Sequence, residues 1–351
     1  LLVFTLVFTA ILSLVTGTSY GSAGSAGVAM MAIGHAMGIN PGMVAGAVIC
    51  GAMFGDKLSP FSDTTNLAPA VAGAKLGDHV KSMLWTTLPP MLISIVIFTI
   101  LGFSQTSGNY DPGDLNAYIG YLEGSFHIGF ATLIPAILII VLLMFRVGAF
   151  EALGIGAVAG ALVAIFVQGA DLQSVLRVAY NGFTSDTDIG VLKSILNRGG
   201  MGSMLQYVAI ITFAVGMGGM LDKLGVLNNI LSIFTKSIRS DGALIFATIM
   251  VGYVTSIVSC SSPMSHVLTG RLMEPLFKER GIEPRILSRC LEDSGTLVGP
   301  MIPWHGYGSY MAGTLGGTWS QFIPFVPLLW LTPLFSIFYG FTGISIKHVE
   351  K

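Results

Sequence analysis

Charged and hydroxyl-bearing residues crowd into one short stretch of the chain. Residues 55–66 read Gly-Asp-Lys-Leu-Ser-Pro-Phe-Ser-Asp-Thr-Thr-Asn. Carboxylate, hydroxyl and amide oxygens are hard ligands of the kind that small cations prefer. Asp56 or Asp63 can therefore alternate between carrying a proton and helping to bind Na⁺. The candidate ion- or proton-binding residues of this stretch are Asp56, Ser59, Ser62, Asp63, Thr64, Thr65 and Asn66.

Pro60 determines how these side chains are expected to be presented. A proline inside a helix removes one hydrogen bond and clashes with the preceding turn, so we expect the helix to break there. The break frees carbonyl groups that can bind a cation, and it starts a new helix with bare N–H groups. Lys57 can neutralise one of the carboxylates. The alternative is purely structural, with Ser62 or Asp63 acting only as the cap of the new helix.

The composition places this stretch inside a membrane. Apolar residues make up 53% of the 351 residues and charged residues only 10%, whereas soluble domains have about 25% charged residues. Several apolar runs approach the roughly 20 residues that span a bilayer. They are 1–15, 82–103, 128–145, 148–167, 203–221, 243–258 and 322–341. We therefore expect an all-α polytopic membrane protein, in which buried charges are costly and usually functional.

A second polar cluster lies far along the chain. Glu292-Asp293-Ser294-Gly295-Thr296 precedes a second expected break at Pro303. We expect Asp293 to contribute to ion or proton binding, with Glu292 and Pro303 in support. Pairing of Asp293 with Arg289, or a capping role, is the alternative. His305 titrates near neutral pH and can sense pH or touch a substrate, but a hydrogen-bonded interior histidine is an equal interpretation.

Net charge and cysteine content narrow the possible partners. The formal net charge is −1, so nothing suggests a nucleic-acid partner. The three cysteines fit neither a disulfide framework nor a transition-metal motif. We expect no cofactor, the lipid bilayer as the surroundings, and Na⁺ and H⁺ as transported ions. A homo-oligomer is possible, but the sequence does not specify one.

The sequence also contains a weak internal repeat. Adding 243 to the residue number brings Pro41 onto Pro284, Gly73 onto Gly316 and Pro90 onto Pro333. Residues 1–38 and 241–281 then share one plan, namely an apolar arm, a small polar tip and a second arm. The tips hold Thr18 and Ser19 in the first case and Ser261 and Ser262 in the second. We expect the tips to bring hydroxyls to the membrane centre, although small residues can also serve only to let the backbone turn.

The distribution of Lys and Arg predicts the orientation, because these residues favour the cytoplasmic side. Residues 105–127 contain no Lys or Arg and are expected outside, whereas a basic cluster over residues 271–289 is expected inside. Both arm-tip-arm segments then become re-entrant hairpins that enter from opposite sides, as in inverted-repeat transporters. The repeat also predicts about 115 further residues, with three more spans, before residue 1 of the natural protein.

These expectations define four regions of the chain. They are the C-terminal part of the first inverted repeat (1–104), an external loop (105–127), the second inverted repeat (128–346) and a cytoplasmic tail (347–351).

The run from Gly55 to Ala68 closely resembles the signature of the NhaC-type sodium/proton antiporter family. Residues 292–296, 302–304 and 310–316 resemble the second-half motifs of the same family. The first motif is highly specific, and the resemblance covers essentially the whole chain. It implies an antiporter of the bacterial inner membrane that exchanges cytoplasmic Na⁺ for external H⁺ by alternating access. The family often has Asn where this chain has His305, and this position bears on the substrate.

Two other functions compete with Na⁺ (or Li⁺) exchange for H⁺. Relatives of the family also exchange organic acids or amino acids with Na⁺ or H⁺ as the coupling ion, and paired helix N-termini beside His305 would suit a carboxylate. A remote alternative is an intramembrane aspartyl protease that uses Asp56 with Asp293. The inverted repeat and the Ser/Thr/Asn cluster have no evident purpose in a protease.

Overall fold

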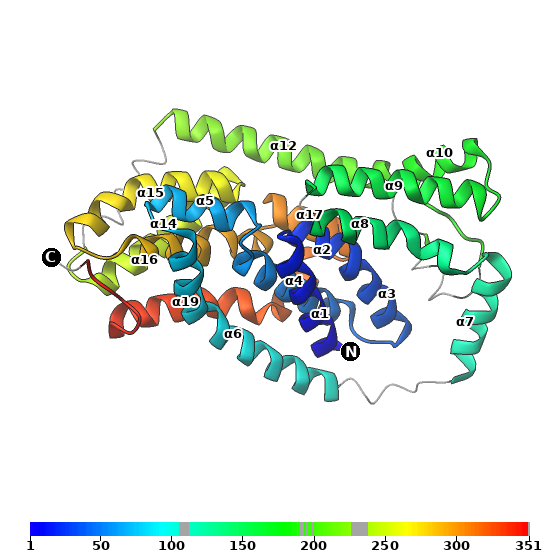
Figure 1. Cartoon of the computed structure of the whole chain (residues 1–351), viewed down its shortest axis with the longest axis horizontal. Coiled ribbons are helices and arrows are strands. Elements are labelled where there is room, and N and C mark those ends of the chain that lie inside the picture. The colour runs from blue at the N-terminus through cyan, green and yellow to red at the C-terminus, as the bar shows by residue number, and fades with distance from the viewer. Residues whose placement is uncertain are drawn as a thin grey trace.

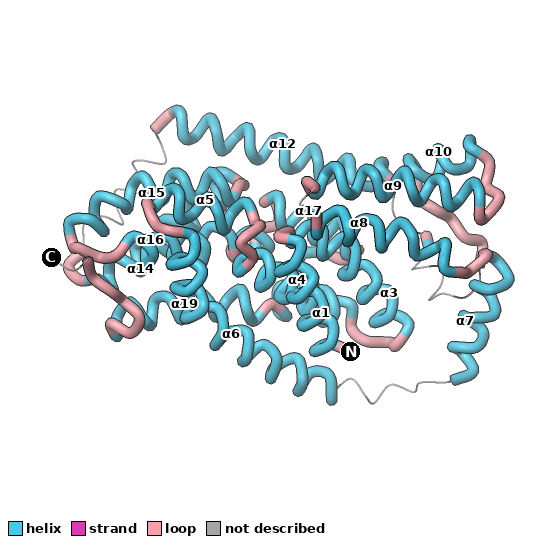
Figure 2. The backbone as a smooth tube through the Cα atoms, viewed as in Figure 1, coloured by secondary structure: helices cyan, strands magenta, loops and turns pink. Residues whose placement is uncertain are grey.

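In the computed structural model, the regular secondary structure of the described residues is helical (Figures 1 and 2). The structure describes residues 1–104, 112–145, 147–187, 189, 193, 196–197, 200–225 and 238–349. Within these ranges β-type pairing is limited to an isolated bridge between Ile282 and His348. The all-α fold class is therefore confirmed. Residues 105–111 of the expected external loop and 350–351 of the expected tail lie outside the described residues.

The helices fall into three consecutive groups. The first comprises α1 (Leu2–Thr16), α2 (Ser19–Ser22), the π-helix η1 (Ala23–Gly27), α3 (Val28–Ala36), α4 (Pro41–Leu58), α5 (Asp63–Ala72) and α6 (Leu76–Ser104). The second comprises α7 (Pro112–Ser125), η2 (Phe130–Leu133), α8 (Ile134–Met144), α9 (Ala149–Phe166), α10 (Leu172–Asn181) and α12 (Met201–Lys223). The third comprises α14 (Asp241–Ser259), α15 (Ser262–Glu279), α16 (Pro284–Leu291), the π-helix η3 (Glu292–Thr296), η4 (Gly299–Met301), α17 (Gly306–Leu315), α18 (Trp319–Phe322), η5 (Ile323–Phe325) and α19 (Pro327–Thr342).

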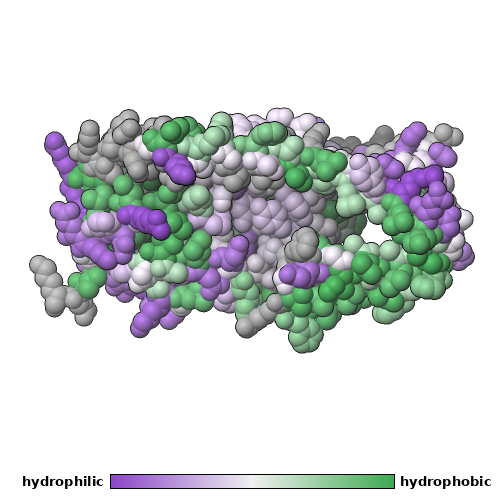
Figure 3. All heavy atoms as spheres, turned by 90° about the horizontal axis from the view of Figure 1, so that it is seen from above, coloured by the Kyte–Doolittle hydropathy of each residue, from purple (hydrophilic) through white to green (hydrophobic). Residues whose placement is uncertain are grey.

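Several of these helices have the length and apolarity of membrane spans. Among the described residues, α6 and α14 satisfy both criteria alone. Two bent pairs satisfy them when each is taken as one span: Ile119–Ser125 with Phe130–Leu142, bent by 95°, and Trp319–Phe325 with Pro327–Thr342, bent by 54°. Figure 3 shows hydrophilic residues gathered toward both ends of the long axis, with broad hydrophobic patches elsewhere on that face. The segment expected as an external loop contains α7, and its side of the membrane stays a prediction.

Helices α1 and α4 pack closely because α4 presents glycines to α1. A Cβ added to Gly51 would lie 2.0 Å from Thr9 Oγ1, and one added to Gly55 would lie 2.3 Å from the carbonyl oxygen of Ala10. Small residues allow this backbone approach, which is a common way for helices to associate in lipid. The residue after Gly55 is Asp56, so the α1–α4 contact also fixes the start of the polar stretch.

We expect Gly55→Ala to destabilise the protein by about 1–3 kcal/mol, the usual cost of overpacking a tight core. The added methyl group must push α1 away from α4. Thermal unfolding of the detergent-purified protein measures the effect. Gly77→Ala in α6 is the control, because a Cβ there meets nothing within 4 Å. Equal melting temperatures for the two variants would contradict the close α1–α4 packing.

The helix that follows each break packs against helices from the other end of the chain. Helix α5 packs against α15 and α16, and its Ala68 and Ala72 are buried in one cluster with residues of α14 and α16. Helix α17 contacts η1 and α2, and its Tyr307 and Met311 are buried with residues of α1 and α4. This packing places α17 beside α2 and α5 beside η3.

Backbone features recur at the offset of 243 residues that the sequence predicts. Gly17 and Cys260 both adopt left-handed conformations, with φ of 71° and 57°. Thr18 and Ser261 follow them in extended conformations, and each side chain accepts a hydrogen bond from the first turn of the next helix. The same offset relates the left-handed pairs Gly38 and Gly281, and Gly73 and Gly316. The opposite orientation of the two parts, and the re-entrant course of the arms, stay predictions.

The C-terminal segment is tied to the start of α16. The amide N–H of Glu283 donates to the carbonyl of Lys347 (2.9 Å), and that of Val349 donates to the carbonyl of Gly281 (2.7 Å). Arg289 Nη1 also donates to Ser345 Oγ (2.9 Å). The cytoplasmic location expected for this tail stays a prediction.

Candidate functional site

The first break lies where Pro60 predicts it. Helix α4 ends at Leu58 and α5 begins at Asp63, with extended backbone at Ser59 and Ser62. Asn66 Nδ2 donates to the carbonyls of Pro60 (2.9 Å) and Ser62 (2.6 Å). Carbonyls that the break would otherwise free are thus already occupied.

Other hydroxyls of the stretch also stabilise the break. Thr65 Oγ1 donates to the carbonyls of Asp56 (3.1 Å) and Lys57 (2.9 Å). Ser59 Oγ donates to the carbonyl of Leu14 (2.7 Å), which ties the break to α1. The side chains of Ser59, Thr65 and Asn66 therefore hold the backbone of the break in position. Direct ion binding by their oxygens stays a prediction.

Asp56 is the buried carboxylate at this break. It is 2% exposed, and its Oδ2 accepts a hydrogen bond of 2.6 Å from Ser19 Oγ. Its Oδ1 has no hydrogen-bond partner among the described residues. Ser19 follows the tip at Gly17 and Thr18, so this hydrogen bond joins the first tip to the first break. A carboxylate with one satisfied and one free oxygen can bind either a proton or a cation.

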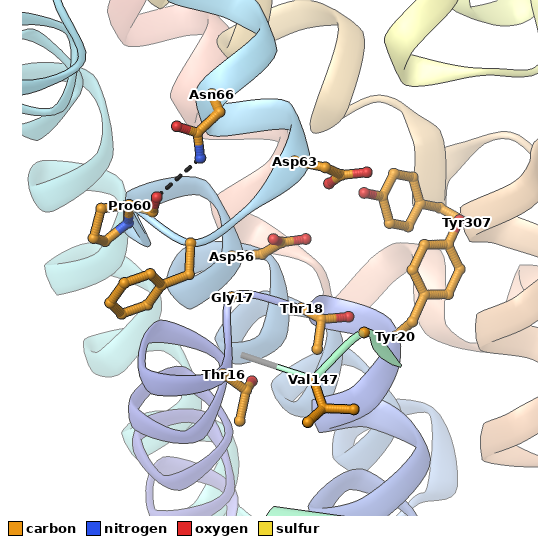
Figure 4. A pocket seen from close by; sticks show the side chains of 12 residues that line it. Thr16, Gly17, Thr18, Tyr20, Asp56, Pro60, Asp63, Asn66, Val147 and Tyr307 are labelled. Atoms are coloured by element: carbon orange, nitrogen blue, oxygen red, sulfur yellow. Dashed lines mark hydrogen bonds between the residues drawn. The ribbon is translucent and has the colours of Figure 1, made fainter. Parts of the chain in front are cut away.

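A cavity of about 540 Å³ opens onto Asp56 (Figure 4). Figure 4 shows Asp63 across from Asp56, with the rings of Tyr20 and Tyr307 on the far side. Its described lining contains two carboxylates and no Lys or Arg: Thr16, Gly17, Thr18, Tyr20, Asp56, Pro60, Phe61, Asp63, Asn66, Val147, Gly148 and Tyr307. This charge distribution favours a cation.

Asp63 differs from Asp56 in its surroundings. It is exposed and begins α5, and its Oδ1 accepts from the amide N–H of Thr64 (2.8 Å). Ser62 Oγ and Thr64 Oγ1 lie 3.2 Å apart beside it. Asp63 therefore sits on the solvated side of the cavity and Asp56 on the buried side. The sequence alone did not distinguish the two.

Lys57 forms a fully buried ion pair with Asp293, which lies 236 residues away in sequence. Thr86 Oγ1 of α6 donates to the same carboxylate oxygen, at 3.1 Å. Lys57 thus neutralises a carboxylate, as expected, but the partner comes from the second polar cluster. Arg289 does not take this role, since its contact is to Ser345.

Glu292, next to Asp293, has a different environment. Its side chain is fully buried, and neither carboxylate oxygen has a hydrogen-bond partner within the described part of the chain. It begins the π-helix η3. π-Helices are rare in proteins, and those that occur are often found at functional sites. No pattern in the sequence predicts this π-helix.

The second tip contacts this π-helix and does not line the cavity. Ser262 Oγ donates to the carbonyl of Gly295 (3.0 Å), and Ser261 caps α15 at Met264 N (3.5 Å). Contacts on the arms repeat at the same offset. Ser13 Oγ donates to the carbonyl of Ala52 (2.6 Å), as Ser256 Oγ does to that of Gly295 (3.1 Å).

His305 links the second break to the cavity through aromatic rings. It is 2% exposed and caps α17, with Nδ1 accepting from the amide N–H of Tyr307 (3.1 Å). Its ring stacks on Tyr307, which stacks on Tyr20 with centroids 4.7 Å apart. The carbonyl of Pro303 accepts from Ser309 Oγ (2.8 Å) in the same turn. Tyr20, Tyr307 and Thr86 were missed as site residues, although Tyr20 directly follows Ser19 and Tyr307 lies two residues after His305.

The described residues contain no candidate site of the His, Cys, Asp and Glu type that holds a transition metal. No three His, Cys, Asp or Glu side chains among them come together to hold a metal ion. The oxygen-rich surroundings of Asp56 suit an alkali cation.

Comparison with known proteins gives a consistent set of relatives. The Na⁺/H⁺ antiporter family matches residues 51–344. The chain is 40% identical over its whole length to a malate-2H⁺/Na⁺-lactate antiporter of Bacillus subtilis (strain 168), of which it covers 75%. It is 38% identical to the Na⁺/H⁺ antiporter NhaC of Alkalihalophilus pseudofirmus, with 99% of the chain and 75% of that protein aligned. It is 35% identical to the Na⁺/H⁺ antiporter NhaC of B. subtilis, with 94% of the chain and 73% of that protein aligned.

Proposed function

Since the chain belongs to the Na⁺/H⁺ antiporter family, we propose that this membrane protein exchanges Na⁺ or Li⁺ for H⁺ across the bacterial inner membrane. The observation that carries the proposal is Asp56, a buried carboxylate with one free oxygen among the described residues, in the lining of a cavity whose described residues include no Lys or Arg. The family is one of transporters rather than enzymes. An aspartyl protease is also disfavoured because Asp293 pairs with Lys57 and not with Asp56.

Competition at Asp56 couples the two ions. When Na⁺ binds Oδ1, the carboxylate is ionised, and Ser19 holds the other oxygen in place. When a proton binds instead, the same oxygen is neutral and Na⁺ leaves. The site holds one or the other, so a cycle between the two sides exchanges them. Asp63 attracts cations into the cavity from its exposed position.

Alternating access arises from the two arm-tip-arm segments. The first tip closes over Asp56 through Ser19, and the second supports η3 through Ser262. If the segments enter from opposite sides, movement of one relative to the other opens the site to each side in turn. The orientation of the C-terminus in the cytoplasm belongs to this proposal.

Exchange of an organic acid is a second candidate, favoured by cavity size. A volume of about 540 Å³ is within the range of small-molecule pockets, and one relative is a malate-2H⁺/Na⁺-lactate antiporter. The two carboxylates of the lining oppose a free anion. An organic acid would therefore enter protonated or together with Na⁺.

Proton flux in proteoliposomes separates the two candidates. Na⁺, Li⁺ and K⁺ are added in turn, followed by malate and lactate with each cation. Proton movement triggered by Na⁺ or Li⁺ alone supports the antiporter. Proton movement that requires a carboxylate, whichever cation is present, would replace it with the organic-acid exchanger.

A further inference from the structure

The buried charges around the two breaks do not balance. Asp56, Glu292, Asp293 and Lys57 are each at most 2% exposed. Lys57 is paired with Asp293, and neither Asp56 nor Glu292 has an ion-pair partner among the described residues, where Arg289 is the other fully buried cation. Burial of an uncompensated charge is costly, most of all within a membrane. Each of these carboxylates is neutralised either by a proton or by a bound monovalent cation.

Glu292 lies outside the cavity that contains Asp56. It is absent from the cavity lining, yet it lies within electrostatic reach of Asp56 and Lys57 and beside the hydroxyls of Thr64 and Thr296. Thr64 belongs to α5 and Thr296 to η3, so the oxygens around Glu292 come from both broken helices. This arrangement arises because α5 packs against α15, α16 and η3.

No neighbouring group forms an ion pair with Glu292 in the described part of the chain. Arg289 of α16 is a second buried cation, but its Nη1 donates to Ser345 Oγ, and its Nε and Nη2 have no hydrogen-bond partner among the described residues. His266 of α15 bonds to Thr296 Oγ1 through Nε2 (3.0 Å). Tyr253 of α14 lies near Asp293, and Tyr307 of α17 near Asp56 and Glu292, as uncharged phenols.

We propose that Glu292, with the hydroxyls of Thr64 and Thr296, forms a second site for a monovalent alkali cation. This inference rests on the proposed exchange of Na⁺ at Asp56 and adds a second cation to it. One cation binds at the cavity floor, and the other binds deeper between α5 and η3. Each carboxylate is then neutralised by its own ion, and Lys57 stays with Asp293.

Equilibrium binding of ²²Na⁺ to the purified protein tests the proposal at alkaline pH, where protons compete least. The wild type is expected to bind about two Na⁺ per protein, and Glu292→Gln and Asp56→Asn about one each, because each change removes one anionic site. Glu274→Gln is the matched control, since Glu274 is a partly exposed residue paired with Lys278 on α15. It should bind as the wild type does.

The outcomes separate this inference from the proposed function. One Na⁺ in both the wild type and Glu292→Gln, with Na⁺-driven proton flux intact, would overturn the second site alone. No Na⁺ binding and no Na⁺-driven flux in the wild type would overturn both. If Glu292→Gln does not fold, Thr296→Val replaces it, because it removes one hydroxyl ligand and keeps the charge. The second site is expected to weaken about tenfold there, the effect of losing roughly 1.4 kcal/mol, and unchanged binding would overturn the proposal.

Discussion

Asp56→Asn is expected to reduce Na⁺-driven proton flux by at least about 30-fold, which corresponds to losing roughly 2 kcal/mol of charge interaction. The amide keeps the size of the side chain and can keep the contact to Ser19. It cannot release a proton, and it offers no negative charge to Na⁺. The measurement is the initial rate of proton movement in proteoliposomes after a Na⁺ pulse.

Two other substitutions serve as comparisons for this effect. Glu123→Gln changes an exposed acidic residue of α7 and should leave the rate unchanged. Asp63→Asn should reduce the rate less than Asp56→Asn, because Asp63 is exposed and the asparagine can still cap α5. A wild-type rate in Asp56→Asn would remove Asp56 from the transport cycle.

Lys57→Ala should destabilise the folded protein by about 3–5 kcal/mol, the cost of leaving one member of a buried ion pair without its partner. Asp293 would keep Thr86 as a hydrogen-bond donor but would lose its counter-charge. The melting temperature in detergent and the yield of monodisperse protein report the loss. Lys81→Ala, at an exposed position of α6, is the control and should melt as the wild type does.

A double variant distinguishes pairing from a general loss of packing. Lys57→Met with Asp293→Leu replaces both charges by apolar groups, an exchange that is often neutral or stabilising for buried pairs. Its melting temperature should recover most of the loss seen in Lys57→Ala. If the double variant melts no higher than the single one, the pair does not stabilise this protein in the way we describe.

Helix ends and breaks were predictable from the sequence because single residues such as proline and glycine determine them. Pro60 ends α4 through its missing N–H, and the glycine at position 17 allows the left-handed turn that ends α1. A Cβ there would also lie 2.7 Å from Phe61 Cβ. The apolar runs became helices because a chain in lipid must satisfy its own backbone groups.

Contacts between distant segments could not be read from the sequence. Lys57 pairs with Asp293 in a fold where α5 packs with α14 and α16, and α17 packs with α1 and α4. No local sequence pattern encodes this packing. Thr65 and Asn66 are a local case, in which the donors contact carbonyls four to nine residues earlier and stabilise the break. Ion binding by their oxygens stays a prediction. The orphaned oxygens of Glu292 became visible only when the side chains around η3 were placed.

Competition of Na⁺ with H⁺ at Asp56 requires that Na⁺ binding releases protons. Na⁺ is added to the purified protein in weakly buffered detergent solution, and the pH change is recorded for the wild type and for Asp56→Asn. We expect Na⁺ to displace protons from the wild type and Asp56→Asn to release fewer. Na⁺ binding without any proton release from the wild type would contradict competition between the two ions.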